Sequence, residues 1–227
     1  MTVIDLSKTP LRDLNQRLHD LNGADWTNEW RITNPSGEHA IAVGLNTPIN
    51  VQIDGPVGYY CGGMNKDAEI TINGHCGWGV GENIMSGLIR VMGNASESAG
   101  ASGRGGMIVI EGDASSRCGI SMKGVDIVVT GSVGHMSAFL AQKGHLVVGG
   151  DVGPDLGASI YEAIIYVQGK VNSLGADCIE KDMTQEHREN LARLLQEAGV
   201  DMDPAGFRRY GSARKLYHFN VDHADAY

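Results

Sequence analysis

Glycine recurs at a fixed interval of 19 residues through most of this chain. Seven glycines share the register: Gly55, Gly74, Gly93, Gly112, Gly131, Gly150 and Gly169. The chain has 32 glycines among 227 residues, and at that content seven hits in one register have a chance of about one in a million. The glycines are therefore ordered, which argues against a flexible linker and indicates a repeat architecture.

The residues around each of these glycines alternate between apolar and other side chains. Around Gly112, for example, Ile108, Ile110 and Ala114 are apolar, and the equivalent positions of the other repeats are apolar and mostly β-branched. Alternation of period two places these residues on one buried face of a strand. One such strand per repeat predicts an all-β solenoid, a parallel β-helix of about seven coils. The glycine column marks a sharp bend, where a Cβ would clash or φ must be positive.

Three repeats carry a fuller pattern, G-x-x-G-x-x-x-G, beginning at Gly55, Gly74 and Gly150. In other repeats Ser96 and Ser115 replace the second glycine. Because serine can replace glycine at this position, the requirement is for small size, which is a steric requirement. A phosphate-binding loop would also seldom recur seven times in one chain. A dinucleotide fingerprint also requires a helix directly after the glycines, whereas here the next repeat strand follows.

Helical segments are predicted on both sides of the repeats. Residues 9–22 carry a stripe of leucines, with Thr9 as N-cap, Pro10 at the first helical position and Gly23 as the stop. Between this helix and the repeats, the segment "HAIAVGL" at 39–45 is expected to be an entry strand.

The second helical segment covers residues 184–199, with Thr184 as N-cap and Gly199 as the stop. At least one of the two apolar stripes is expected to pack on an end of the rod or on a partner subunit, because a bare β-helix has open strand edges. Beyond it lies a basic strip, for which a solvated tail and an ionic contact to a partner remain open; it comprises Arg208, Arg209, Arg214 and Lys215.

Bulk properties narrow the class of protein. The net charge of −9 disfavours nucleic-acid binding, since phosphate backbones are repelled. No stretch approaches the length of a membrane span, and the N-terminus lacks the apolar region of a secretory signal. We therefore expect a cytoplasmic protein.

The cysteines and histidines do not form a recognisable site. Cys61 and Cys118 hold the same coil position about 14 Å apart, too far for a disulfide or a shared metal, and Cys76 stands in an apolar column. His135 and His145 lie in neighbouring coils at different positions, with no nucleophile or orienting carboxylate evident. We expect no catalytic, cofactor-binding or metal-binding residue in this chain.

Two classes of β-helix enzyme are weaker alternatives. Hexapeptide acyltransferases repeat an aliphatic residue every six positions, whereas the interval of this chain is about three times longer. Pectate-lyase-like enzymes gather acids and a basic residue in one groove, whereas here acids such as Asp54, Glu111 and Asp151 stand at coil corners. An independent β-helix enzyme stays open as an alternative on these grounds.

The repeated G-x-x-G-x-x-x-G on a β-helix resembles the GXGXG domain of glutamate synthase large subunits. The lead-in "ITNPSGEHAIAVG" and the coils "GDASSRCGISMKGVDIVVTGSVG" and "GGDVGPDLGASIYEAIIYVQG" carry the likeness, which covers roughly residues 31–180. The resemblance implies a right-handed coil. It divides the chain into an N-terminal helical cap (1–30), the GXGXG β-helix domain (31–180), and a C-terminal helix with a basic tail (181–227).

In glutamate synthase this domain ends a very long polypeptide, whereas here it starts at its own Met1. The chain therefore most resembles the free-standing glutamate-synthase-like subunit of bacterial N-methylglutamate synthase (methylamine–glutamate N-methyltransferase). The resemblance implies a hetero-oligomer with an amidotransferase-like subunit and an FMN-binding synthase-like subunit, the latter also holding an iron–sulfur cluster. It implies a scaffold without catalytic residues beside an ammonia or amine channel.

A related family shares the same glycine framework. It comprises the β-helix subunits of formylmethanofuran dehydrogenase and of the formyltransferase/hydrolase complex, which handle one-carbon units. The extent of the lead-in likeness favours the glutamate-synthase side.

Overall fold

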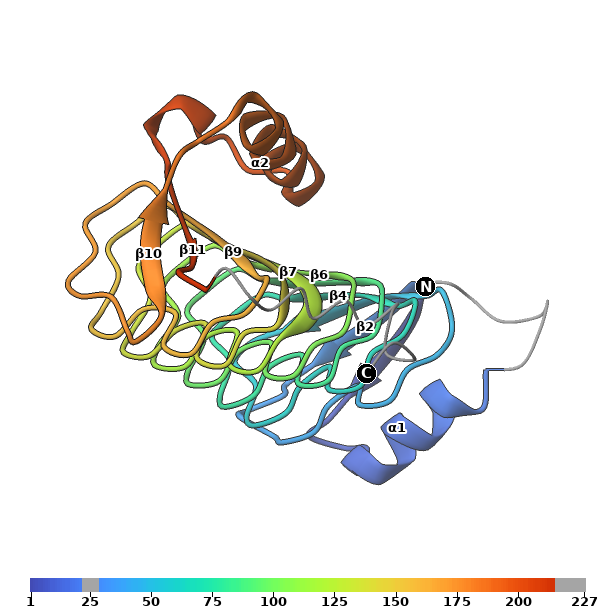
Figure 1. Cartoon of the computed structure of the whole chain (residues 1–227). Coiled ribbons are helices and arrows are strands. Elements are labelled where there is room, and N and C mark those ends of the chain that lie inside the picture. Colours follow the sequence, from blue (N-terminus) through green and yellow to red (C-terminus); the bar gives the residue numbers. More distant parts are fainter. Residues whose placement is uncertain (22–28, 215–227) are drawn as a thin grey trace, which may run out of the picture.

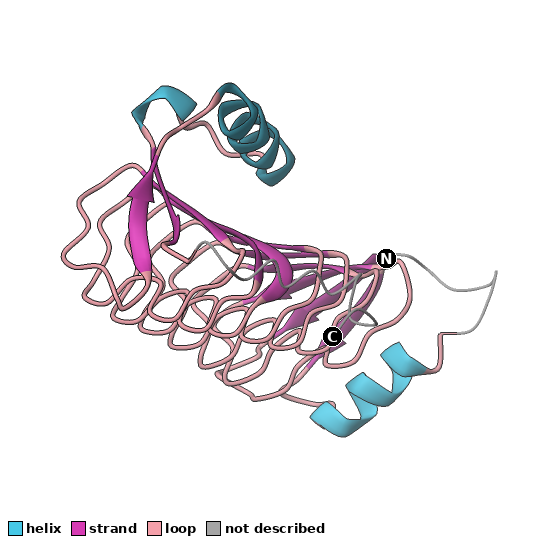
Figure 2. Cartoon of the chain, viewed as in Figure 1, coloured by secondary structure: helices cyan, strands magenta, loops and turns pink. Residues whose placement is uncertain are grey.

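The computed structural model describes residues 1–21 and 29–214 and is a β-solenoid of about seven turns with two helices packed against it (Figure 1). One mostly parallel sheet of the described residues has the strand order β1-β2-β3-β4-β5-β6-β7-β8-β9-β11-β10. Its strands are β1 (Thr2–Asp5), β2 (Glu29–Thr33), β3 (Asn50–Asp54), β4 (Glu69–Ile72), β5 (Leu88–Val91), β6 (Met107–Ile110), β7 (Lys123–Val129), β8 (Lys143–Val148), β9 (Ile164–Val167), β10 (Cys178–Lys181) and β11 (Arg208–Ser212). The helices are α1 (Leu11–His19), α2 (Gln185–Ala198) and the short 3₁₀ helix η1 (Pro204–Gly206). The predicted fold class is confirmed, and the loops that close each coil stack below the sheet (Figure 2).

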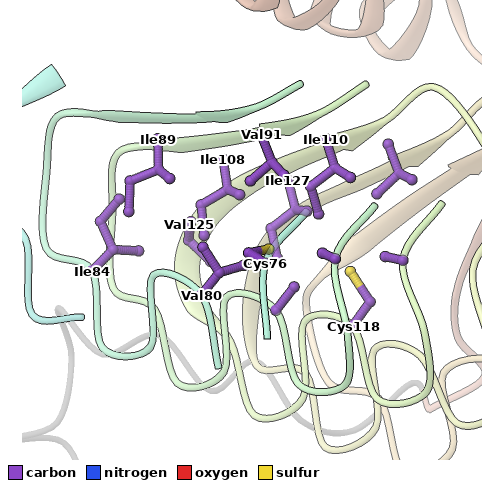
Figure 3. Packing of buried hydrophobic residues seen from close by; sticks show 14 of the residues in the cluster. Cys76, Val80, Ile84, Ile89, Val91, Ile108, Ile110, Cys118, Val125 and Ile127 are labelled. Atoms are coloured by element: carbon purple, nitrogen blue, oxygen red, sulfur yellow. The ribbon is translucent and has the colours of Figure 1, made fainter. Parts of the chain in front are cut away.

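Each strand from β3 to β8 pairs in parallel with the next strand along the chain, so that equivalent positions of successive repeats lie side by side. One interior ladder runs through Val51, Ile70, Ile89, Ile108, Ile127, Leu146 and Ile165. A second runs through Val57, Cys76, Ala95, Ala114, Val133, Val152 and Val171. Both belong to one apolar core inside the coils, part of which Figure 3 shows. The predicted buried face of the strands is therefore confirmed.

A ladder of polar side chains holds the corner beside the glycine column. Each member stands one residue after a column glycine and accepts a hydrogen bond of 2.7–3.0 Å from a backbone N–H of the next coil. The members are His75, Asn94, Asp113, Ser132 and Asp151. Each bond contributes about 1 kcal/mol net. The position needs an acceptor on a short or planar side chain, which accounts for its Asn, Asp, Ser and His content.

The solenoid begins one coil earlier than the glycine register predicts. β2 pairs in register with β3, from Glu29↔Asn50 onward, so the first coil is two residues longer than the repeat. Asn34, with φ of 57°, takes the place that a glycine holds in the next coil. The predicted entry strand at 39–45 is wrong, because these residues form turns, with Ala42 at φ of 56°.

Three further strands without a glycine signal, β1, β10 and β11, complete the sheet. β1 pairs in parallel with β2 and extends the sheet beyond the first coil. β11 returns from the C-terminal region and lies antiparallel between β9 and β10, where Tyr210 is buried in the interior core. None of these three strands belongs to the glycine-marked repeat, so periodicity could not predict them.

The start of α1 differs from the prediction. Pro10 occupies the N-cap position with φ of −56° and ψ of 141°, and no side chain caps the helix. Thr9 is therefore not the N-cap. The predicted stop at Gly23 lies outside the described residues.

α1 packs on the first coil through its leucine stripe. Leu14 and Leu18 are fully buried in the interior core cluster. Between them Asn15 donates to the carbonyl of Ala40 at 2.9 Å and accepts from the N–H of Ala42 at 3.0 Å. These two bonds satisfy backbone groups in a turn of the first coil, which has no preceding coil to bond to. α1 therefore packs on an end of the rod, as predicted for at least one of the two helices.

α2 begins and ends as predicted. Thr184 is its N-cap, and Gly199 closes it in the left-handed conformation at φ of 62°. Its apolar stripe lies across the outward face of β6 to β9, on a second core cluster formed with Val109, Val128 and Val147. It thus covers the side of the rod. Among residues 1–21 and 29–214, no helix has the length and apolar character that a membrane span requires.

Candidate functional site

The glycine column is crowded by backbone. At the six glycines from Gly74 to Gly169, an added Cβ would come closer than 3.0 Å to the backbone of the preceding column glycine. At Gly112 and Gly131 it would also meet the ladder side chains Asn94 and Asp113. Only Gly55, the first of the seven, has a positive φ, 134°. A close approach of stacked coils, and not a left-handed bend, therefore explains six of the seven glycines.

The four cysteines are free and buried. Burial raises the pKa of Cys76 and Cys118 to about 12 and that of Cys178 to about 11, and it raises the pKa of Cys61 as well. A nucleophilic cysteine needs a lowered pKa, so these thiols are inert packing groups. Within the described ranges no three His, Cys, Asp or Glu side chains are grouped as metal ligands.

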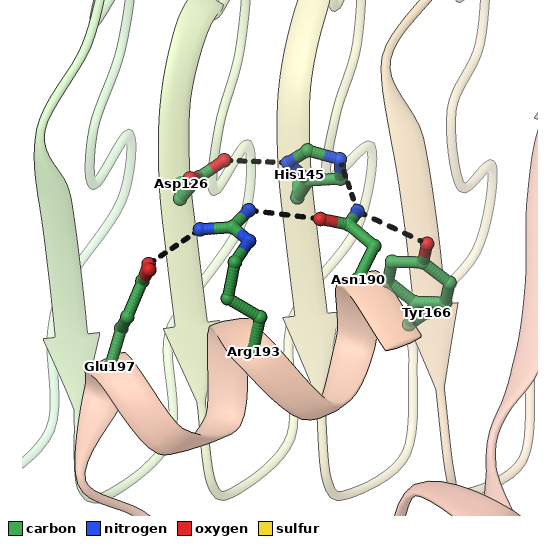
Figure 4. Close-up of polar contacts among 6 residues, drawn as sticks. All are labelled: Asp126, His145, Tyr166, Asn190, Arg193 and Glu197. Atoms are coloured by element: carbon green, nitrogen blue, oxygen red, sulfur yellow. Dashed lines mark hydrogen bonds and ion pairs between the residues drawn. The ribbon is translucent and has the colours of Figure 1, made fainter. Parts of the chain in front are cut away.

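The main polar cluster lies where α2 crosses the sheet (Figure 4). His145 on β8 places its Nδ1 2.7 Å from Oδ1 of Asp126 on β7. Its Nε2 lies 2.8 Å from Nδ2 of Asn190 on α2. Asp126 and His145 stand one repeat apart in the sequence and are therefore neighbours in adjacent coils, a signal that the sequence analysis missed. The structure thus supplies the orienting carboxylate for His145 that was not evident in the sequence.

The hydrogen bonds determine the tautomer of the His145 imidazole. The side-chain oxygen of Asn190 accepts from Arg193 at 2.9 Å, so its amide nitrogen faces His145 and can only donate. Nε2 is therefore the acceptor, and Nδ1 carries the proton that it donates to Asp126. In this state His145 has no free lone pair with which to act as a general base.

α2 is held to the sheet at both ends. Near its start, Asn190 bonds to His145 and lies 3.5 Å from the hydroxyl of Tyr166, whose pKa is raised by burial. At its end, Arg90 on β5 pairs with Glu111 and donates to the carbonyl of Ala198, where the helix dipole is negative. The cluster therefore works as a clamp on α2.

An open groove of about 520 Å³ runs beside this clamp. Its lining residues are His145, Ile164, Glu186, His187, Glu189, Asn190 and Arg193. Burial, and next the positive charge of Arg209, lower the pKa of His187. The ring nitrogens of His145 are already engaged, so the groove presents chiefly a mixed-charge surface.

The described part of the basic strip bonds to this chain itself. Arg208 donates to the carbonyl of Gly169 at 2.7 Å, and Arg209 donates to the carbonyl of Asp182 at 2.8 Å. Arg214 pairs with Asp177 and stacks over the ring of Tyr161. These arginines attach β11 and its flanking residues to the rest of the chain, a role that differs from both the solvated tail and the ionic contact to a partner. Lys215 lies outside the described residues.

Comparison with known proteins gives one full-length relative. The chain is 57% identical to Protein GlxC of Rhizobium meliloti (strain 1021) over 228 residues, covering all of both chains. No family model matches the chain.

Proposed function

The chain belongs to the family of Protein GlxC, and from this premise and its fold we propose that it is a non-catalytic scaffold subunit of a glutamate-synthase-like complex. The complex we favour is N-methylglutamate synthase, which converts glutamate and methylamine to N-methylglutamate and ammonia. Its partners would be an amidotransferase-like subunit and an FMN-binding synthase-like subunit that also holds an iron–sulfur cluster. The β-helix would set these two beside an ammonia or amine channel.

The observation that carries this proposal is the filled interior of the repeating coils. A single apolar cluster extends from Ile4 to Tyr210, and six of the seven column glycines lie in close contact with the backbone of the preceding coil. Among the described residues only Asn65 and Ser137 are polar and fully buried. A rod packed in this way offers a rigid surface, and a rigid surface is what holding other subunits requires.

The polar cluster under α2 also supports a structural role. His145 and Asp126 could serve in catalysis only if Asn190 left Nε2 free. In the folded chain the bonds instead attach a helix to the sheet. The four unpaired, buried cysteines favour a cytoplasmic location, which the proposal includes.

Activity measurements test the scaffold assignment. The purified chain is assayed with glutamate and methylamine, first alone and then with amidotransferase-like and flavin-binding subunits from the same source. We expect turnover only from the assembled subunits. Turnover by this chain alone would refute the scaffold role.

Affinity purification of the tagged chain tests the choice of complex. Flavoprotein and amidotransferase partners, identified by mass spectrometry, are expected. Recovery of formyl-transferring subunits instead would move the chain to the related one-carbon complexes and end the N-methylglutamate proposal.

A further inference from the structure

An aromatic patch stands exposed at one corner of the first three coils. It consists of His39, Tyr59, Tyr60 and Trp78. The two tyrosines are each 46% exposed and the tryptophan is 47% exposed. Aromatic side chains make up only 6% of the chain, so three exposed large rings at one corner need an explanation.

The rings contact one another in a fixed arrangement. His39 stacks on Tyr59 with centroids 4.3 Å apart and an angle of 16° between planes. Trp78 lies 6.0 Å from Tyr59, and Tyr60 meets Tyr59 edge-on at 6.4 Å. Tyr59 and Trp78 stand one repeat apart in the sequence, so they occupy the same position of adjacent coils.

Glycines lie directly beneath the rings of the patch, where any side chain would clash with them. A Cβ on Gly77 would lie 2.8 Å from the ring of Tyr59, and one on Gly79 would lie 2.8 Å from the ring of Tyr60. A Cβ on Gly58 would clash with the imidazole of His39. Stacking of the coils alone requires only small residues at this position. In the next two coils, which have no aromatic ring here, Ser96 and Ser115 replace Gly77. Glycine is therefore found where a ring lies over the backbone. Packing on these glycines fixes the positions of the rings before any partner binds, which lowers the entropy cost of binding.

Carboxylates surround the patch. Glu38 precedes His39 and is exposed, and Glu97 follows Trp78 by one coil. Glu82 brings its Oε2 to the same side of Gly79 as the Tyr60 ring. None of these three carboxylates forms an ion pair within residues 1–21 and 29–214. Electron-rich ring faces with unpaired negative charges around them attract cations.

We propose that this patch is the docking surface for a protein partner that presents arginine or lysine side chains to the rings. The ring of Tyr59 already lies between His39 and Trp78, so the guanidinium or ammonium group would contact the exposed rings of Trp78 and Tyr60, and the carboxylates would neutralise its charge. Rigid tyrosine and tryptophan side chains commonly provide the strongest contacts of an interface. The proposal rests on the scaffold role argued above, but it does not depend on which complex the chain serves.

Site-specific photocrosslinking identifies the occupant. Tyr60→p-benzoylphenylalanine is introduced into the full chain in cells that naturally produce it, with Met92→p-benzoylphenylalanine as the control. Met92 is 50% exposed and stands in the bend directly after β5, outside the turns that carry Tyr59, Tyr60 and Trp78. We expect a heteromeric adduct at position 60 alone, joined to a peptide that contains arginine or lysine.

Binding measurements with the crosslinked partner, purified intact, complete the test. Trp78→Ala should raise the Kd by at least about tenfold, and Met92→Ala by less than about twofold. Glu97→Gln removes charge without removing packing, and it should raise the Kd by about threefold and weaken its salt dependence. Thermal unfolding of each variant checks that the chain remains folded.

Several results would overturn the proposal. They are no adduct at position 60, an adduct with the mass of two copies of this chain, a crosslinked peptide without basic residues, and unchanged affinity in folded Trp78→Ala and Glu97→Gln. A basic partner that is neither amidotransferase-like nor flavin-binding would support the docking surface and refute the proposed complex, so the two failures are distinguishable.

Discussion

Replacing Gly112 with alanine tests the packing of the solenoid directly. Its N–H donates to the carbonyl of Gly93 at 3.2 Å, and its carbonyl accepts from Gly131 at 3.1 Å, so neither neighbouring coil can move aside freely. The new methyl group would come closer than 3.0 Å to that Gly93 carbonyl and would also meet Oδ1 of Asn94. The substitution therefore adds volume where backbone and a ladder side chain already lie.

The expected cost has two parts. Overpacking costs about 1–3 kcal/mol. Displacing Asn94 also breaks its hydrogen bond to the N–H of Asp113, worth about 1 kcal/mol. Gly112→Ala should therefore lower the free energy of unfolding by about 2–4 kcal/mol, which for a chain of this length lowers Tm by about 5–15 °C.

Gly211→Ala is the matched control. Gly211 lies on β11, and its added Cβ would meet nothing closer than 3.5 Å, the Cδ of Lys181. We expect a change below about 0.5 kcal/mol there. Urea unfolding followed by circular dichroism gives both midpoints, and unchanged m-values show that the same structure unfolds in each variant.

A double variant separates the two parts of the cost. Asn94→Ala removes the side chain that the new methyl group displaces, so Asn94→Ala combined with Gly112→Ala should cost less than the sum of the single changes. If Gly112→Ala unfolds at the same urea concentration as Gly211→Ala, the explanation of the glycine column by close approach is wrong.

Three further predictions concern the clamp, the thiols and the effect of acid. Asn190→Ala should lower the free energy of unfolding by about 1–2 kcal/mol and speed amide hydrogen exchange in α2, whereas unchanged exchange would show that the clamp does not hold the helix. All four cysteines should resist iodoacetamide at about pH 8 until urea unfolds the chain, because the thiolate is the reactive form; labelling counted by mass spectrometry in the folded protein would contradict this. Hydrogen bonds from Asn73 and Arg31 lower the pKa of Asp54, so its stabilising contribution is present above the unfolded value and is lost as pH falls through the lowered one. Asp54→Asn should reduce the loss of urea resistance between about pH 5 and pH 3, and a pH profile parallel to that of the unaltered chain would refute the assignment.

The repeating part of the fold was predictable because stacking imposes the same demand on every coil. Each coil lays its strand on the previous one, so Ile89, Ile108 and Ile127 recur at the same interval as the glycines between them. The polar ladder is equally regular but does not show as a repeat in the sequence, because Asn94 and Asp113 are chemically different residues that share only their function as acceptors.

The two ends of the solenoid were less predictable because they depart from the interval. The first coil is two residues longer, and Asn34 replaces a glycine at a positive φ. At the other end β11 is placed by the free edge of β9, which is a tertiary contact between segments far apart in the sequence. Local patterns carry no information about such pairing.

The sequence also contains a signal for the position of α2. β6 and the end of β7 are apolar on both faces, as Met107, Val109 and Val128 show, whereas strands covered on one face alternate. A doubly apolar strand needs a second layer, and the C-terminal leucine stripe was the available segment. The pairing of His145 with Asp126 follows from the repeat interval, but its closure by Asn190 required the helix to be placed first.

The two halves of the rod therefore differ in what they offer to other proteins. The later coils cover their outward face with α2 and fasten it through His145 and Arg90, so that face is already occupied. The outward face of the early strands is polar, as Gln52 and Thr71 illustrate, and has no helix over it in the described residues. The aromatic patch lies at a corner of these same early coils. The part of the rod that α2 covers and the part that carries the exposed rings are therefore separate. We expect a partner subunit to bind to the first three coils, whereas α2 stabilises the later ones.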